Sequence, residues 1–113
     1  MKVIKNKIQI NELKKMAEEM FGNLVKVVVD VEKEIMVANG ELHSDEQELL
    51  IEKGSKPENL WGINIYPEAE AENWIEFDSV INLKPHLGNR TRGVDNPEIK
   101  EKIIKIVNKL ISL

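Results

Sequence analysis

The chain has 113 residues, a length that fits one folded domain, and a net charge of −4 from 16 basic and 20 acidic side chains. The absence of cysteine excludes disulfide bonds, thiolate metal sites and cysteine nucleophiles, and the negative charge with few aromatic residues argues against a nucleic-acid-binding protein. No signal sequence is visible and no apolar run approaches the roughly 20 residues of a membrane span, so we expect a cytoplasmic protein without a membrane partner.

The N-terminal third predicts an extended arm, a helix and a strand. Residues 3–10 alternate weakly between apolar and polar side chains, which indicates a short edge strand or an extended arm. Asn11 is a good helix N-cap, and apolar residues then recur at helical spacing until a glycine stop at Gly22. Residues 24–31 form the clearest strand of the chain. Its two faces consist of Val25, Val27, Val29 and Val31 on one side and Lys26, Val28 and Asp30 on the other.

The middle of the chain predicts a hairpin, a helix and a second hairpin. Residues 35–42 are apolar on both faces, so we expect them to pair with the preceding strand and to be the more central of the two. Ser44 and Gln47 match the spacing of a capping box, which predicts that a helix starts at Ser44. Residues 60–66 and 74–83 then alternate as two further strands.

The C-terminal part predicts an irregular segment and a last helix. Residues 84–96 show no periodicity, and Pro97 suits the first turn of the helix that follows. The predicted order is (β)αββαββα. We therefore expect a single α+β domain over residues 1–113, with a four-stranded, mainly antiparallel sheet, a possible fifth N-terminal strand, and three helices packed on one face.

Residues 82–94 concentrate side chains that are rare elsewhere in the chain. They include both arginines, the only threonine and one of the two histidines, and they lie between a strand end and a helix start. Arginines beside the N–H groups of a helix start suit a phosphate or carboxylate group. The predicted ligand-binding residues are Asn82, Lys84, Asn89, Arg90 and Arg92. In the alternative interpretation the segment is a structural loop, in which the arginines pair with the acidic middle region and Asn89 forms a turn.

His43 is the only good candidate for a general base near neutral pH, with Asp45 beside it. If the preceding strand continued, Glu41, His43 and Asp45 would share one face and could bind a divalent metal ion or move a proton. A second histidine ligand would have to be His86. In the alternative interpretation Asp45 only favours the start of a helix through the helix dipole.

Asp78 is a further catalytic candidate on the polar face of the strand predicted at residues 74–83. Together with Glu76 it could form a carboxylate pair with a raised pKa, close to Asn64 and Tyr66 on the neighbouring strand. The alternative is a sheet face turned to water. No Walker-type spacing is present, so the sequence assigns no cofactor.

Three segments together resemble a prokaryotic family of short proteins of unknown function. They are Gly40 to Asp45 (GELHSD), Leu60 to Asn64 (LWGIN) and Ile81 to Gly93 (INLKPHLGNRTRG), followed by the helix that starts at Pro97. The resemblance covers nearly the whole chain. It implies a free-standing prokaryotic domain and carries no activity or ligand with it.

Two hypotheses of function follow from these observations. In the first, the protein is a binding module or enzyme for a small phosphorylated or carboxylated ligand at residues 82–94. In the second, it is a homodimeric or accessory protein without catalytic activity, as the wide apolar stripe of the last helix and the apolar residues 110–113 indicate. The dominance of lysine and glutamate among the charged residues also favours a thermophilic source.

Overall fold

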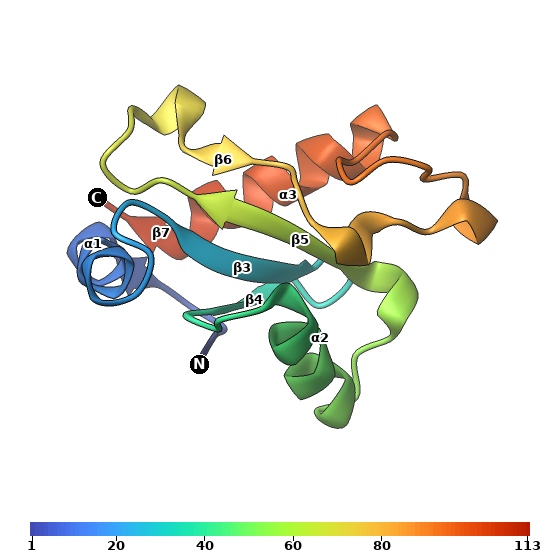
Figure 1. Ribbon diagram of the computed structural model, residues 1–113, viewed down its shortest axis with the longest axis horizontal. Helices are drawn as coiled ribbons and strands as arrows, with labels where there is room; N and C mark the ends of the chain where they lie inside the picture. Colours follow the sequence, from blue (N-terminus) through green and yellow to red (C-terminus); the bar gives the residue numbers. More distant parts are fainter.

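A five-stranded sheet runs through the centre of the computed structural model, which describes residues 1–113 (Figure 1). The strand order is β1-β4-β3-β5-β6, and every neighbouring pair is antiparallel. The strands are β1 (Lys2–Ile4), β3 (Val25–Asp30), β4 (Ile35–Ala38), β5 (Leu60–Ile65) and β6 (Ile75–Glu76). Two further strands, β2 (Ile8–Gln9) and β7 (Ile111–Ser112), form a small parallel pair apart from this sheet. The α+β class and the antiparallel sheet are thus as predicted, and the N-terminal strand is present as β1.

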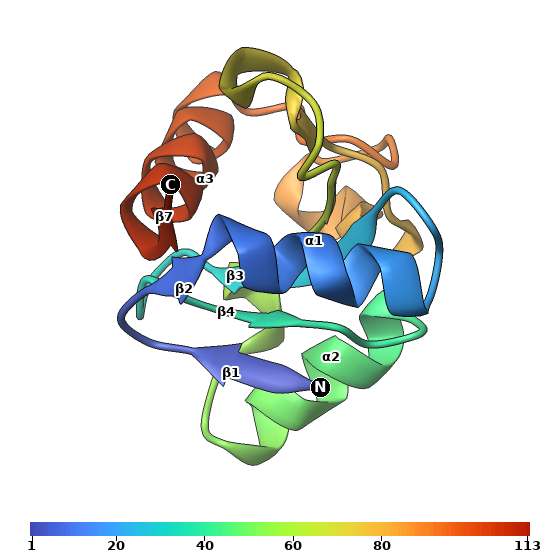
Figure 2. The same ribbon diagram turned by 90° about the vertical axis from the view of Figure 1, so that its left-hand side faces the viewer.

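The three helices cover both faces of the sheet, which corrects the prediction that all of them pack on one face. The helices are α1 (Ile10–Glu19), α2 (His43–Glu52) and α3 (Pro97–Leu110). In Figure 2, α1 and α3 lie above the strands and α2 lies below them. The reason is visible in β3, where Val27 and Val29 face one side and Val28 faces the other. Because both faces are apolar, each needs a helix to exclude water.

The two faces bury very different amounts of apolar surface. On the side of α1 and α3, 21 buried residues form one continuous cluster. This core includes Leu13, Met16, Val27, Val29, Met36, Trp61, Ile63, Ile103, Ile106 and Leu110. On the side of α2 the cluster has 4 fully buried members, Val28, Val37, Leu50 and Leu60. The apolar stripe of α3 is therefore part of the core of its own chain.

Two helix starts differ from the predicted ones. The N-cap of α1 is Gln9 and not Asn11, because β2 pairs with β7 and holds Gln9 extended directly before the helix. The N-cap of α2 is Leu42 and not Ser44, and no side chain caps this helix. The start of α3 is as predicted, with Pro97 in its first turn.

The strand predicted at residues 74–83 is much shorter in the structure. Only Ile75 and Glu76 pair with β5, and the chain then leaves the sheet and forms a 3-10 turn at Val80–Asn82. In the first hairpin, β4 is internal because β1 pairs with its outer edge, but β3 is the central strand of the sheet. No helix of the structure is both long and apolar enough to cross a membrane.

Candidate functional site

Asn82 takes the place of a neighbouring strand at the edge of β5. Its side-chain oxygen accepts a hydrogen bond from the Gly62 N–H at 2.8 Å, and its side-chain nitrogen donates to the Gly62 carbonyl at 2.9 Å. A carboxamide offers the same donor and acceptor as a peptide group, so this side chain continues the hydrogen-bond ladder where β6 ends. The same nitrogen also donates to the Arg92 carbonyl at 2.8 Å. Because Asn82 is fully buried, it shapes the site from inside and has no surface for a ligand.

Asn89 holds the loop that follows in one shape. Its side-chain nitrogen donates to the carbonyls of Asn82 and Gly93 at 2.7 and 2.9 Å, and its side-chain oxygen accepts from the Asp95 N–H at 2.7 Å. Asn89 is also buried. The two asparagines together tie residues 82–95 to each other and to β5.

Lys84 is buried as well, although its residue type normally lies at the surface. Its ammonium group donates to the Ile81 carbonyl at 2.8 Å and lies 5.1 Å from the centroid of the Trp61 ring. Burial lowers the pKa of Lys84. Its ammonium group therefore interacts with Ile81 and Trp61, and Lys84 does not line the cleft described below.

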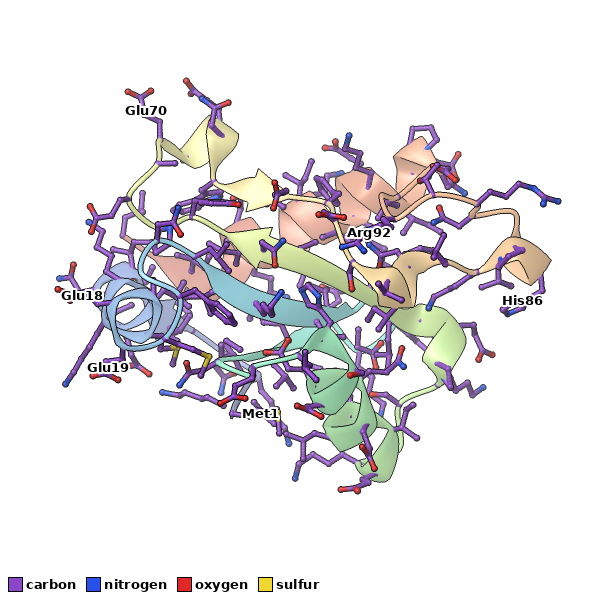
Figure 3. All side chains as sticks on the ribbon, in the orientation of Figure 1. Met1, Glu18, Glu19, Glu70, His86 and Arg92 are labelled. Atoms are coloured by element: carbon purple, nitrogen blue, oxygen red, sulfur yellow. The ribbon has the colours of Figure 1, made fainter.

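The two arginines have different surroundings. The Arg92 Nε–H donates to Asp78 Oδ1 at 2.6 Å, and the Arg92 carbonyl accepts from the Ser79 N–H at 2.9 Å. Arg90 is exposed, and its side chain makes no hydrogen bond or ion pair in the protein. Figure 3 shows Arg92 close to the sheet and His86 at the outer tip of the same segment, so these two side chains do not meet.

Asp78 is an ionised partner of Arg92, which corrects the prediction of a raised pKa. The hydrogen bond from Arg92 lowers the pKa of this carboxyl group. Glu76 turns to other partners and accepts hydrogen bonds from Asn64 Nδ2 at 2.9 Å and from the Tyr66 hydroxyl at 3.1 Å. The two acids therefore do not share a proton.

His43 is the first residue of α2, and only 8% of its surface is exposed. Its Nε2 lies 2.7 Å from the Ile63 carbonyl, which can only accept, so Nε2 carries the proton and Nδ1 is the acceptor of the ring. Nδ1 has no partner in the protein. Burial lowers the pKa of His43, and the nearby charges of Lys26 and Arg92 lower it further against the opposing effects of Ile63 and Asp78. The ring is therefore neutral at pH 7.

Gly62 makes room for this histidine. A Cβ atom at this position would lie 2.5 Å from Ser79 Oγ and 3.2 Å from His43 Cδ2. Because no side chain fits between them, Gly62 lets both residues pack directly on β5. This explains the glycine in the segment from Leu60 to Asn64.

A cleft of about 290 Å³ lies where these elements meet. It is lined by Lys26 of β3, by Leu42, His43 and Ser44 at the start of α2, by Ser79, Val80 and Ile81 of the 3-10 turn, and by Arg92. Lys26 reaches it because β3 pairs with β5 so that Lys26 lies opposite Asn64. Lys26, Ser44 and Ser79 were not among the predicted site residues. The one available signal was a single lysine among the valines of β3.

The metal site considered for residues 41–45 does not form. Glu41 and Asp45 are exposed, and no group of three or more histidine, aspartate or glutamate side chains is arranged to hold a metal ion. Because the chain turns into α2 at His43, the three side chains do not share the face of a strand. The group that orients His43 is the Ile63 carbonyl and not Asp45.

Glu46 is a buried acid in the first turn of α2. It is fully buried, and its Oε2 accepts a hydrogen bond from the Gly40 N–H at 3.0 Å. Burial raises the pKa of Glu46 to about 9, so this carboxyl group is neutral at pH 7. A Cβ atom on Gly40 would lie 2.6 Å from Glu46 Cγ.

Comparisons with known proteins identify the family of the chain. The profile of a family described as a protein of unknown function, DUF5674, matches residues 2–110. No curated protein and no solved structure gives a significant match. The match covers all three segments on which the resemblance was based, from Gly40 to Gly93. The chain belongs to the DUF5674 family of proteins of unknown function.

Proposed function

We propose that the protein binds a small anionic ligand in the cleft between the start of α2 and Arg92. The observation that carries this proposal is that an uncapped helix start and two cationic side chains, Lys26 and Arg92, line the same cleft. The site thus differs from the predicted one. Of the residues predicted at positions 82–94, Arg92 alone lines the cleft, and the others support it or lie outside it.

The charges in and beside the cleft favour a negative ligand. Asp78 offsets one positive charge, but its ion pair uses only Nε of Arg92 and leaves the other guanidinium nitrogens available. Lys26 forms no salt bridge, and its ammonium group lies 5.3 Å from the centroid of the Phe21 ring. With His43 neutral, these groups leave a net charge of +1. The N-terminus of α2 adds the positive end of a helix dipole.

The size and rim of the cleft limit what it can hold. Its volume of about 290 Å³ is at the small end of the range for ligand pockets. Leu42 and Val80 at the rim are more than half exposed, at 56% and 62%. A ligand with an anionic head and a short apolar part would match both the charged interior and this rim.

Thermal unfolding with a panel of anions tests the proposal. Phosphate, sulfate, acetate and a sugar phosphate would each be added to the wild-type protein and to three variants, Lys26→Gln, Arg92→Ala and Arg90→Ala. We expect at least one anion to raise the melting temperature of the wild type, since a ligand that binds only the folded state stabilises it. Lys26→Gln and Arg92→Ala should lose most of this shift.

Arg90→Ala is the matched control, because it removes the same side chain two residues away and outside the cleft. It should keep the full shift. If no anion stabilises the wild type, the proposal is wrong. If Arg90→Ala loses the shift as completely as Arg92→Ala does, the ligand binds elsewhere on the loop.

A homodimeric or accessory protein is the second candidate. Its first motivation was the apolar stripe of α3, which the structure places in the core of the chain. The observation that now favours it is the exposure of Leu42, Val80, Leu83 and Leu87, each between 45% and 62%. Light scattering at tens of micromolar protein tests it, and a monomeric mass would reject a stable dimer. The cytoplasmic location and the thermophilic, prokaryotic source stay predictions.

A further inference from the structure

We infer that the anion bound in the cleft carries its own O–H group and donates it to His43 Nδ1. Hydrogenphosphate, phosphate monoesters in their monoanionic form and α-hydroxy acids have this chemistry, whereas sulfate and simple carboxylates do not. The inference rests on the proposed anion-binding function and defines its ligand class.

The protonation state of His43 is set by its backbone neighbour. Its Nε2 faces the Ile63 carbonyl at 2.7 Å, and this acceptor fixes the proton on Nε2. Nδ1 then has a free lone pair. It belongs to a residue that lines the cleft and is only 8% exposed. Nδ1 itself keeps contact with solvent in the free protein, so a ligand that excludes solvent from it must donate to it or leave it unpaired.

The other side chains of the cleft are mostly donors or apolar groups. Lys26 and Arg92 are donors only, and the side chains of Leu42, Val80 and Ile81 have no polar atoms. The hydroxyl groups of Ser44 and Ser79 can donate or accept, and Ser79 Oγ already accepts from the Ile81 N–H at 3.2 Å. Among the side-chain atoms of the lining residues, Nδ1 is thus the one acceptor that cannot also donate while the ring is neutral.

Nδ1 makes the cleft selective for anions that carry a proton. An oxyanion without a proton would place a negative oxygen against the Nδ1 lone pair, or would leave Nδ1 unpaired inside the complex. An anion with an O–H group satisfies the cations and Nδ1 together. Loss of one buried hydrogen bond of this kind corresponds to about a tenfold or larger loss of affinity.

Calorimetric titration of the wild-type protein at pH 7.5 tests the inference with two matched pairs of anions. The first pair is phosphate and sulfate, and the second is glycolate and acetate. In each pair that shows binding, we expect the anion with the O–H group, phosphate or glycolate, to bind at least about ten times more tightly than its partner. A preference for phosphate would indicate a phosphoryl ligand, and a preference for glycolate would indicate a hydroxy acid.

The outcomes separate this inference from the proposed function. If both members of a pair bind equally, or if sulfate or acetate binds more tightly, the inference is overturned and the anion site stands. If none of the four anions binds, and none stabilises the protein thermally, the anion site itself is wrong. These measurements need no variant, so a folding defect cannot obscure them.

The pH dependence of the preference gives a second readout. The charged groups that face His43 are Lys26 from β3, Asp78 from the segment after β6 and Arg92 from the loop before α3. When the ring becomes protonated at low pH, Nδ1 becomes a donor. Sulfate should then gain affinity, and the preference for phosphate should disappear. A preference that is unchanged after the His43 ring titrates, as followed by its ¹⁵N resonances, would overturn the inference.

The two histidines of the chain provide a matched pair of variants. His43→Phe removes the acceptor, and we expect it to bind phosphate and sulfate with equal affinity. His86→Phe changes the exposed histidine at the far end of the loop and should keep the wild-type preference. Equal loss of preference in both variants would contradict a role of Nδ1.

Discussion

The two faces of the sheet are covered by different kinds of buried side chains. On the face of α1 and α3, buried apolar side chains from these two helices and from six strands (β1, β2, β3, β4, β5 and β7) meet in one large cluster. On the other face the buried apolar cluster has only four members, one of them Leu50 of α2 itself, and polar side chains occupy the rest of this face. These include His43, Glu46, Asn64 and Asn82, each 8% exposed or less. Apolar packing is non-directional, whereas buried polar groups need specific partners, so the second face is the one where the positions of individual side chains are tightly specified.

The largest difference between the faces should appear in the pH dependence of stability. The pKa of Glu46 is raised from 4.5 to about 9, so the folded state holds a proton that the unfolded state has released. The stabilisation that neutral Glu46 contributes is therefore fully present below pH 4.5, and it is lost as the pH rises toward 9. Over this range the free energy of unfolding should fall by about 1.4 kcal/mol per pH unit from this group alone.

Glu46→Gln tests this expectation, because glutamine resembles the neutral acid. Its stability should exceed that of the wild type by several kcal/mol at pH 9 and should match it near pH 5. Urea unfolding at pH 5, 7 and 9 measures the difference. Glu48→Gln, on the exposed side of the same helix, is the control and should not alter the slope. Parallel curves for Glu46→Gln and the wild type would show that Glu46 is ionised in the folded protein.

On the apolar face, a substitution that creates a cavity should lower the free energy of unfolding by a large amount that does not depend on pH. Ile103 of α3 is fully buried in the main cluster, so Ile103→Ala should lower the free energy of unfolding by about 3–4 kcal/mol through lost burial and a residual cavity. The variant should still bind anions normally at temperatures where it is folded, since Ile103 does not line the cleft. Weakened binding in the folded variant would mean that the two faces are coupled.

Asn82→Ala should affect both stability and binding. It removes three hydrogen bonds and leaves the N–H and carbonyl groups of Gly62 without partners at a buried strand edge. We expect a loss of about 3 kcal/mol in urea unfolding, together with weaker anion binding because the Arg92 backbone is released. Asn82→Asp keeps the acceptor for the Gly62 N–H but puts a second oxygen against the Gly62 and Arg92 carbonyls, so it should destabilise the protein at least as much as Asn82→Ala. A variant with near wild-type stability would contradict the role of Asn82 as a substitute strand.

The sequence predicted the parts of the fold that depend on periodicity. The valines of β3, the strand β5 and the helix α3 follow from alternation and from helical spacing, and all three are present. The short β6 could not be predicted, because residues 74–83 alternate as a strand does while the pairing beyond Glu76 is replaced by the side chain of Asn82. The position of α2 on the opposite face was hidden for a related reason. Val28 stands between Lys26 and Asp30, so its face looked polar.

Only part of the candidate site could be predicted, because local patterns do not reveal which distant segments lie together. His43, Asp78 and Arg92 were selected for their chemistry, and the structure brings them close enough to influence one another's charge. Lys26 was missed, because its place beside them depends on the register between β3 and β5. The burial of Glu46 was missed, because an acid in the first turn of a helix is also favoured at the surface. Local sequence patterns can select residues with suitable chemistry, but the pairing of distant segments determines which of these residues lie together.

The smallest effect on stability should come from the residue with the largest proposed effect on binding. The ion pair of Arg92 and Asp78 is about half exposed on both sides, with 54% and 47% of the side-chain surfaces accessible. Exposed pairs contribute roughly 0–1 kcal/mol, so Arg92→Ala should change the free energy of unfolding by no more than about 1 kcal/mol. Asn82 and Arg92 are joined by a hydrogen bond, yet one is expected to act mainly on folding and the other mainly on the ligand. A loss of 3 kcal/mol in Arg92→Ala would place this arginine with the structural residues of the loop, and its loss of anion binding would then follow from disorder rather than from a missing charge.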